Sequence, residues 1–413
     1  MQNQTKKVLL RAPLLTSSGY GVHSRQIARW LFDKEKDLDI EITTEPLNWG
    51  HTSWITNIDA ENGLIKKILN ANTPYETKPG TPPFDVTIQL QLPNEWNPSL
   101  GTFNVGVTAC VEATLCHPDW VDHCNSMSLV VVPSEFTKGV FAATAAKTNK
   151  RLTTPIQVVP EAFPDVFLAG QHNPRSDVSK ALDKLPTAFN LLFVGQITAT
   201  DVDLDRKNMY RMMALLNQVF SGHKDVGLIL KTSFVTQSVR DREVTQNLLN
   251  QAIAGLNIKG NPKATLLHGT LSDEEMFDLY THPKVSALVS LTHGEGFGLP
   301  LLEAAAAGLP VMATNWSAHT EFLNAGPRWL PIAHTMRTIP EKKADGRIWI
   351  GGSEWADVND HDFGVKVKKF YDGSSLPKQW AKEGAEKLKK LYSFEAVSKH
   401  YDRVLGKSLG LGD

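Results

Sequence analysis

Cysteine is scarce in this chain of 413 residues, which contains only Cys110, Cys116 and Cys124. Three cysteines so close together are too few for the disulfide framework of a small secreted protein. His117 and His123 lie in the same stretch, but the close cysteine pairs of structural zinc sites are missing. We therefore interpret the three cysteines as buried free thiols.

Long apolar runs and a strong net charge are also missing. No stretch is apolar over enough residues to span a bilayer, and the first residues lack the apolar core of a signal peptide. The formal net charge is −1, and residues 1–170 contain 14 Lys and Arg against 17 Asp and Glu. Proteins that bind nucleic acid or membrane surfaces usually carry a large basic excess. We therefore expect a cytoplasmic protein that binds any anionic partner through a local basic patch.

Short apolar segments alternate with helical patterns along the chain, which predicts parallel α/β sheets. Strands are expected at residues 7–11, 40–44, 84–90, 103–108, 129–134, 156–160, 190–195, 226–232, 264–268 and 287–290. Helices are expected at residues 24–31, 209–220, 242–254, 273–280, 300–307 and 377–405. A polar stretch interrupts the alternation before residue 190. We predict a first domain at 1–175, a second at 176–385, and a C-terminal helix at 386–413.

Residues 293–311, HGEGFGLPLLEAAAAGLPV, place two carboxylates beside a glycine-rich helix start. Pro300 suits the first helical turn and Gly308 suits the C-terminal cap. Glycines in the loop let a ligand approach the backbone, and the free amides at a helix start attract phosphate or hydroxyl oxygens. Glu295 in the loop and Glu303 one turn into the helix would repel phosphate. Hydroxyl groups of a sugar ring and of a ribose are their fitting partners.

The spacing of these residues resembles the signature of glycosyltransferase family 4, whose members are retaining enzymes of the GT-B fold. Other segments resemble the family in the same order along the chain, namely residues 132–136, 193–195 with 206–208, and 267–275. The resemblance covers nearly the whole chain. It implies two Rossmann-like domains whose parallel sheets face a central cleft, and a C-terminal helix that returns to the first domain.

The resemblance also implies that the second domain binds a nucleotide diphosphate sugar, expected to be UDP-linked, and that the first binds the acceptor. Glu303 would bind the ribose and Glu295 the donor sugar. Arg206 and Lys207 would stabilise the diphosphate as the leaving group. Glu112 is a candidate contact to the sugar or the acceptor. The further candidate donor contacts are Gly19, Gly21, Lys231, Leu271, Gly296, Phe297, Gly298 and Leu299. Gly19 and Gly21 would let the first loop close over the diphosphate.

Catalysis in the family retains the anomeric configuration without a clear protein nucleophile. The route implied is attack on the same face of the sugar, with the leaving phosphate taking the acceptor's proton. We therefore assign no general base, and we expect no metal ion and no cofactor.

The chain departs from the family at Gln196, where an arginine usually follows Val-Gly, and Lys231 is a candidate replacement. Residues 201–205, DVDLD, look like a metal motif of the other large glycosyltransferase fold. Their position before Arg206 favours a solvated acidic loop instead.

Three tryptophans leave two interpretations open, because each suits either an acceptor-stacking surface or the core. They are Trp49, Trp54 and Trp96.

Residues 11–25 resemble the N-terminal motif of glycosyltransferases of large tailed bacteriophages. We therefore expect 5-hydroxymethylcytosine, or another hydroxymethylated pyrimidine in double-stranded DNA, as the acceptor, and the host cytoplasm as the location. The acidic first domain disfavours DNA, and an envelope or capsule glycan is the alternative. A non-catalytic regulator that binds sugar nucleotides is an alternative of another class. A third alternative is a sugar-phosphate epimerase or a phosphorylase on the same two-domain scaffold, of which the phosphorylase is disfavoured because no lysine motif for pyridoxal phosphate is apparent. The sequence does not indicate an oligomeric state.

Overall fold

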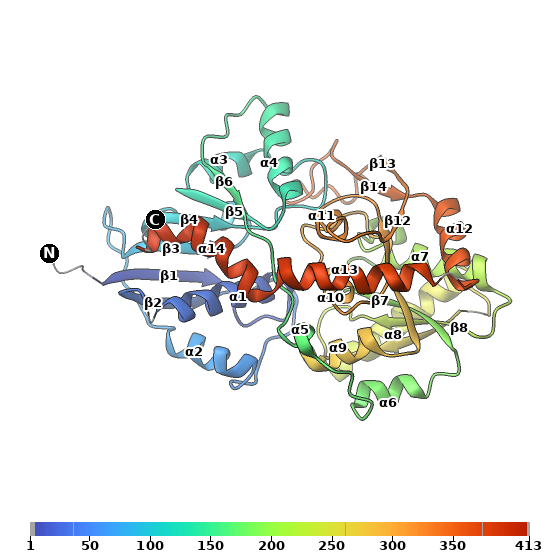
Figure 1. Ribbon diagram of the computed structural model, residues 1–413. Helices are drawn as coiled ribbons and strands as arrows, with labels where there is room; N and C mark the ends of the chain where they lie inside the picture. Colours follow the sequence, from blue (N-terminus) through green and yellow to red (C-terminus); the bar gives the residue numbers. More distant parts are fainter. Residues whose placement is uncertain (1–4, 36, 261, 374, 411–413) are drawn as a thin grey trace. The chain divides into compact units, whose positions relative to one another are not determined.

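The computed structural model describes residues 5–35, 37–260, 262–373 and 375–410, which divide into two compact units (Figure 1). The first unit holds the described residues up to Ala162, residues 346–350, and the chain from Phe394 onward. The second unit holds residues 163–345 and 351–393. The division after Ala162 lies earlier in the chain than the boundary that we placed at residue 175.

The first unit is built on a six-stranded sheet in the order β2-β1-β3-β4-β5-β6, in which every neighbouring pair is parallel. Its strands are β1 (Lys6–Ala12), β2 (Ile40–Pro46), β3 (Phe84–Leu90), β4 (Gly101–Val107), β5 (Leu129–Val132) and β6 (Ile156–Val158). Its helices are α1 (Gly19–Lys34), α2 (Leu64–Asn70), α3 (Asp119–Asn125), α4 (Glu135–Lys147) and α14 (Phe394–Leu409), with short 3-10 turns at Glu61–Gly63 and Pro93–Glu95. Parallel sheets need helices on their faces, because both faces of each strand are apolar.

Helix α14 packs into the core of the first unit, as Figure 1 shows beside α1. The ring of Tyr401 lies 5.4 Å from that of Trp30, and its hydroxyl lies 3.0 Å from Nε2 of His23. Trp30 Nε1 donates to Asp402 at 2.9 Å. The expected return of a C-terminal helix to the first domain is therefore confirmed. The single amphipathic pattern at 377–405 is two helices, because the chain leaves the helical conformation at Ser393.

The second unit is built on a second parallel sheet, in the order β12-β11-β10-β7-β8-β9. Its strands are β7 (Phe189–Val194), β8 (Val226–Lys231), β9 (Lys263–Leu267), β10 (Val285–Ser290), β11 (Val311–Thr314) and β12 (Leu330–Ile332). An antiparallel pair, β13 (His334–Thr338) and β14 (Glu354–Val358), follows. The sequence did not predict the last four strands, which are short and lack long apolar runs.

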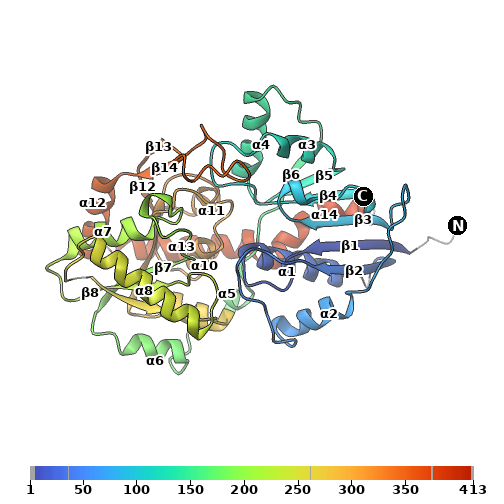
Figure 2. The same cartoon turned by 180° about the vertical axis from the view of Figure 1, so that it is seen from behind.

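Helices cover both faces of this second sheet. They are α5 (Val166–Ala169), α6 (Asp177–Asp183), α7 (Met209–Phe220), α8 (Val239–Gly255), α9 (Asp273–Thr281), α10 (Leu299–Ala306), α11 (His319–Leu323), α12 (Asp360–Tyr371) and α13 (Leu376–Tyr392), with a 3-10 turn at Val202–Leu204. Figure 2 shows α8 in front of the sheet and α13 behind it. Within the described ranges, no helix combines the length and the apolar character needed to cross a membrane.

Candidate functional site

The loop between β10 and α10 forms as the sequence predicts. The chain leaves β10 after Ser290, and Gly298 precedes α10 in the left-handed conformation, with φ of 102°. Pro300 lies in the first helical turn, and Gly308, with φ of 78°, follows the end of the helix. A side chain at Gly298 would be strained, so glycine there sets the direction in which α10 begins.

Glu295 is buried in this loop between two cations. Its side chain is 6% exposed, and Lys207 Nζ donates to its two carboxylate oxygens at 2.7 and 2.9 Å. Arg206 Nη1 lies 3.5 Å from Oε2. Burial alone would raise the pKa of Glu295, but the charges of Lys207 and Arg206 outweigh burial and lower it to about 2. The carboxylate is therefore ionised and the three side chains together carry a net charge of +1.

The basic pair is held in place by the loop after β10. The backbone amide of His293 donates to the carbonyl of Arg206 at 2.9 Å, and Arg206 Nη1 donates to the carbonyl of Gly294 at 2.6 Å. Lys207 passes close to Gly195, since a Cβ there would lie 3.7 Å from the lysine Cδ. Both basic side chains are only about one-seventh exposed, at 14% and 15%. They are thus part of a built site and not of a solvated loop.

The sequence analysis missed two buried residues near Glu295, Ser317 in the loop after β11 and His319 at the start of α11 (His319–Leu323). Ser317 accepts a hydrogen bond from the backbone amide of Glu295 at 2.9 Å and has a positive φ of 79°. His319 is fully buried, with Nε2 2.7 Å from the carbonyl of Thr314. Burial lowers the pKa of His319, so it is neutral at pH 7. A positive φ at a serine is uncommon and cannot be read from the sequence.

Glu303 has the opposite environment to Glu295. It lies in α10, is partly accessible, and accepts a hydrogen bond from the Tyr280 hydroxyl at 3.1 Å. Burial, followed by repulsion from Asp273, raises the pKa of Glu303 to about 8. The Glu303 carboxyl is therefore largely protonated at neutral pH. Tyr280 comes from α9 and was not anticipated from the sequence.

The other predicted donor contacts at the start of α10 can offer a ligand their backbone groups but not their side chains. The Phe297 side chain is 5% exposed and packs on Phe322, with ring centroids 5.5 Å apart, and Leu299 is also buried. The side chains of Phe297 and Leu299 therefore belong to the core. A ligand at Gly296, Phe297, Gly298 and Leu299 would meet backbone groups.

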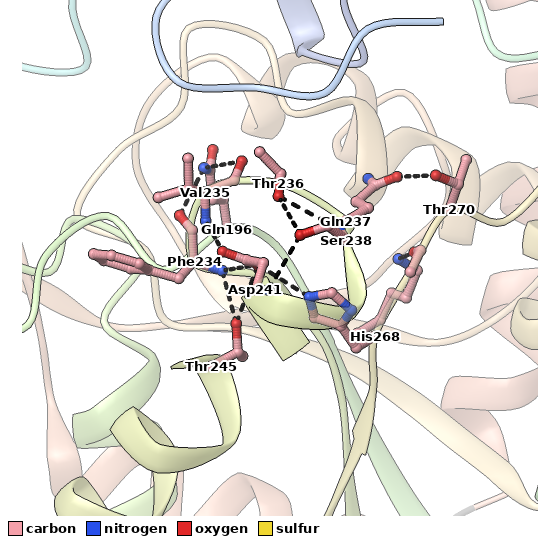
Figure 3. A network of polar contacts seen from close by, with 12 residues as sticks. Gln196, Phe234, Val235, Thr236, Gln237, Ser238, Asp241, Thr245, His268 and Thr270 are labelled. Atoms are coloured by element: carbon pink, nitrogen blue, oxygen red, sulfur yellow. Dashed lines mark hydrogen bonds and ion pairs between the residues drawn. The ribbon is translucent and has the colours of Figure 1, made fainter. Parts of the chain in front are cut away.

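The side chains of Gln196 and Lys231 donate hydrogen bonds to backbone carbonyls of neighbouring loops. Gln196 donates from Nε2 to the carbonyl of Phe234 at 2.8 Å, which holds the loop after β8 (Figure 3). Lys231 donates to the carbonyl of Gly269 at 2.6 Å, on the loop that leads to Leu271 and α9. Burial lowers the pKa of Lys231 to about 8. Lys231 thus braces the loop that contains Leu271, and its suggested replacement of an arginine stays a prediction.

Asp241 is the centre of the network in Figure 3. Its carboxylate lies 3.0 Å from His268 Nε2 and accepts from the amides of Phe234 and Val235 at 3.2 and 3.0 Å. Burial would raise the pKa of Asp241, but these hydrogen bonds lower it overall. The network joins the loops after β8 and β9 to the start of α8.

The three aspartates of residues 201–205 do not converge on one point. Asp201 accepts from the amide of Asp203, which lies 3.7 Å from Arg337. Asp205 is fully buried and accepts from the amide of Met209 at 2.8 Å. The interpretation as a solvated loop is therefore wrong for Asp205, whose carboxylate is bound to the first amide of α7. Within the described ranges, no cluster of three or more His, Cys, Asp or Glu suits a metal ion.

Gly19, Gly21 and Glu112 lie in the first unit. The expected loop at Gly19 and Gly21 is wrong, because α1 begins at Gly19 with Ser18 as its N-cap. A Cβ at Gly21 would lie 2.1 Å from the carbonyl oxygen of Thr16, so this glycine is required by local packing. Glu112 lies on the loop after β4 and is partly exposed.

The cysteines and tryptophans can now be placed. Cys110, Cys116 and Cys124 are buried free thiols, which confirms that prediction. Trp96 is 6% exposed and packs against Gly106 in the core. Trp54, by contrast, is 44% exposed.

Solved structures of similar fold identify the fold of the chain. The chain is similar to a glycosyltransferase from Rickettsia africae, with a TM-score of 0.63, 13% identity, and coverage of 99% of this chain and 100% of that one. It is similar to sucrose-phosphate synthase from Thermosynechococcus elongatus, with a TM-score of 0.62, 13% identity, and coverage of 98% and 100%. It is also similar to the trehalose-6-phosphate protein of E. coli bound with UDP-2-fluoro glucose, with a TM-score of 0.60, 9% identity, and coverage of 98% and 99%. The chain has the GT-B fold.

The family comparison covers a smaller part of the chain. Residues 248–330 match the family described as glycosyl transferases group 1. This range contains Glu295, Glu303, Ser317 and His319, while the basic pair lies before it. No curated protein matches the chain by sequence. Fold and family match together support a glycosyltransferase.

Proposed function

We propose that this protein is a retaining glycosyltransferase that moves a sugar from a nucleotide diphosphate sugar to a hydroxyl group of an acceptor. The observation that carries the proposal is the buried Glu295 between Lys207 and Arg206, at the start of a helix within the range matched by group 1 glycosyl transferases. A UDP-linked donor is supported by the UDP-2-fluoro glucose named with the E. coli relative. No feature of the chain itself selects the base or the sugar.

Donor binding would rearrange charge within this site. In the free protein Lys207 is paired with Glu295, so its charge is already compensated. A diphosphate would compete for Lys207 and Arg206, and the released Glu295 would accept hydrogen bonds from the sugar hydroxyls. Glu303 would accept from the ribose hydroxyls.

The basic pair then stabilises the negative charge that develops as the bond between sugar and phosphate breaks. Retention is explained by attack of the acceptor hydroxyl on the same face of the sugar. The leaving phosphate oxygen takes the acceptor's proton, so no protein nucleophile or general base is assigned.

The acceptor is a separate part of the proposal. A hydroxymethylated pyrimidine in DNA is a candidate because residues 11–25 resemble bacteriophage glycosyltransferases. A glycan is favoured by the charge of the first unit, where residues 47–63, 91–100 and 108–118, which directly follow β2, β3 and β4, contain no lysine or arginine.

The test is donor turnover across a panel of nucleotide sugars, followed by mass spectrometry. We expect one donor to be hydrolysed slowly to sugar and nucleoside diphosphate without an acceptor. Glu295→Gln, which keeps the side-chain size, should abolish that hydrolysis. A protein that binds a nucleotide sugar tightly but turns over no member of the panel would instead be the non-catalytic regulator.

A further inference from the structure

The loop after β2, residues 47–58, is ordered across the carboxyl end of β1 in the first unit. The amide of Leu47 donates to Ala12 at 2.9 Å, and the amide of Ile55 donates to Leu15 at 2.7 Å. In return, the amide of Ser17 donates to Ser53 at 2.8 Å. This pairing holds the loop against the segment that leads into α1.

This loop presents aromatic side chains. Trp49 stacks on Tyr20, with centroids 4.3 Å apart and an interplanar angle of 21°. The Tyr20 hydroxyl lies 3.1 Å from the hydroxyl of Thr108 and accepts from the amide of Ala109, also at 3.1 Å. Trp54 is 44% exposed, although its backbone forms a bridge with Thr16. An indole held open on a hydrogen-bonded loop offers a flat apolar surface to a ring.

The charges at the same edge disfavour a phosphate-rich ligand. The loops at 47–63, 91–100 and 108–118 contain Asp59, Glu61, Glu95 and Glu112, but no lysine or arginine.

The nearby arginines are already paired. Arg11 lies 3.2 Å from Glu45, and Arg25 pairs with Glu61 through a 2.5 Å contact. Arg347, which belongs to the same unit, lies 2.9 Å from Glu95. Binding of a DNA backbone depends on cations that can neutralise phosphates. Carboxylates instead accept hydrogen bonds from hydroxyl groups.

We propose that the loop at residues 47–58 is an acceptor subsite that binds a ring of a neutral saccharide by stacking it on Trp54. A sugar ring has an apolar face for the indole and hydroxyl groups for carboxylates. Asp59, directly after this loop, is exposed and can accept from them. This inference rests on the proposed function and names the acceptor class of the same enzyme.

The experiment measures binding of the full chain to a panel of neutral oligosaccharides and to a duplex containing 5-hydroxymethylcytosine. We expect saccharide binding and no binding of the duplex. Trp54→Ala should weaken saccharide binding roughly five- to tenfold, the effect of losing one aromatic stacking partner, while Trp54→Phe should retain most of it. Ile58→Ala is the matched control, because Ile58 is 50% exposed on the same loop and should be neutral.

Three results would overturn the inference: no saccharide binds, Trp54→Ala binds like the parent, or only the duplex binds. UDP affinity of the parent and of Trp54→Ala is measured alongside by calorimetry. Equal UDP binding in both, with saccharide binding weakened in the variant, supports the subsite. Absence of UDP binding in the parent would count against the proposed function itself.

Discussion

Glu295 and Glu303 belong to one loop-helix segment, yet their carboxyl pKa values lie on opposite sides of the ordinary value. Two cations lower the pKa of Glu295 to about 2 in spite of its burial. Burial and Asp273 raise the pKa of Glu303 to about 8. Glu295 is thus a permanent acceptor, whereas Glu303 gains its full acceptor strength only when it ionises.

Glu303→Ala should weaken nucleotide binding by roughly 1.5–3 kcal/mol, the range for a hydrogen bond to a charged group. Because the pKa of Glu303 is raised to about 8, its carboxyl must lose a proton before it can accept the strongest hydrogen bond from the ribose. Nucleotide affinity of the parent should therefore increase between about pH 6 and pH 9. Calorimetry at several pH values checks both statements.

Glu303→Gln is the control for that pH series, since an amide does not titrate. The nucleotide affinity of Glu303→Gln should not increase between about pH 6 and pH 9. Unchanged affinity in Glu303→Ala would remove the ribose assignment.

Acid should destabilise the parent through Glu295. Its pKa is about 2 in the folded protein against an ordinary 4.5, so the unfolded chain binds the proton more readily. The resulting stability is present above about pH 5 and is lost as the pH falls toward 2. Glu295→Gln should be less stable than the parent by a few kcal/mol at neutral pH, because it removes the carboxylate charge between Lys207 and Arg206, roughly as expected for a broken buried pair.

Urea unfolding of the parent and of Glu295→Gln at neutral pH and at about pH 3 measures this difference. We expect the gap between the two free energies of unfolding to shrink in acid. A gap that is the same at both pH values would contradict the pKa assignment.

At the scale of elements, the two glycines at the start of α1 differ in how tightly they are packed. Gly21→Ala would place Cβ 2.1 Å from the carbonyl oxygen of Thr16, whereas the space around Gly19 is open. We expect Gly21→Ala to lower the free energy of unfolding by about 1–3 kcal/mol, as overpacking does. Gly19→Ala should leave it nearly unchanged. Thermal unfolding of the pair is the measurement, and equal stabilities would contradict the packing account.

The sequence predicts some elements well and others poorly, for physical reasons. The start of α10 was predicted because Pro300 and Gly308 have strong local preferences at helix ends. The start of α1 was not, since glycines near a helix start usually indicate a loop, and the N-cap role of Ser18 was overlooked. Ser317 and His319 were missed because a buried contact between distant segments leaves no local pattern.

At the scale of the whole molecule, alternating strands and helices sufficed to predict two parallel sheets. The assignment of residues 346–350 to the first unit could not be predicted, because it depends on tertiary contacts. The break at Ser393 was hidden by one continuous amphipathic pattern.

Donor turnover should not depend on a metal ion. Arg206 and Lys207 supply positive charge at the proposed leaving group, and Asp205 is committed to the start of α7. We therefore expect donor turnover to survive EDTA. If chelation abolished activity and magnesium or manganese restored it, the prediction would be wrong and residues 201–205 would be candidate metal ligands.

The central claim is that the basic pair stabilises the departing diphosphate, an effect larger in the transition state than in the ground state. The most direct test is steady-state turnover of the donor by Lys207→Ala, Arg206→Ala and the double variant, with Lys207→Arg as a check on geometry. We predict that kcat of the double variant falls on the order of a hundredfold or more, with a smaller rise in donor KM. A double variant that turns over at the parent kcat and only binds donor more weakly would contradict the account.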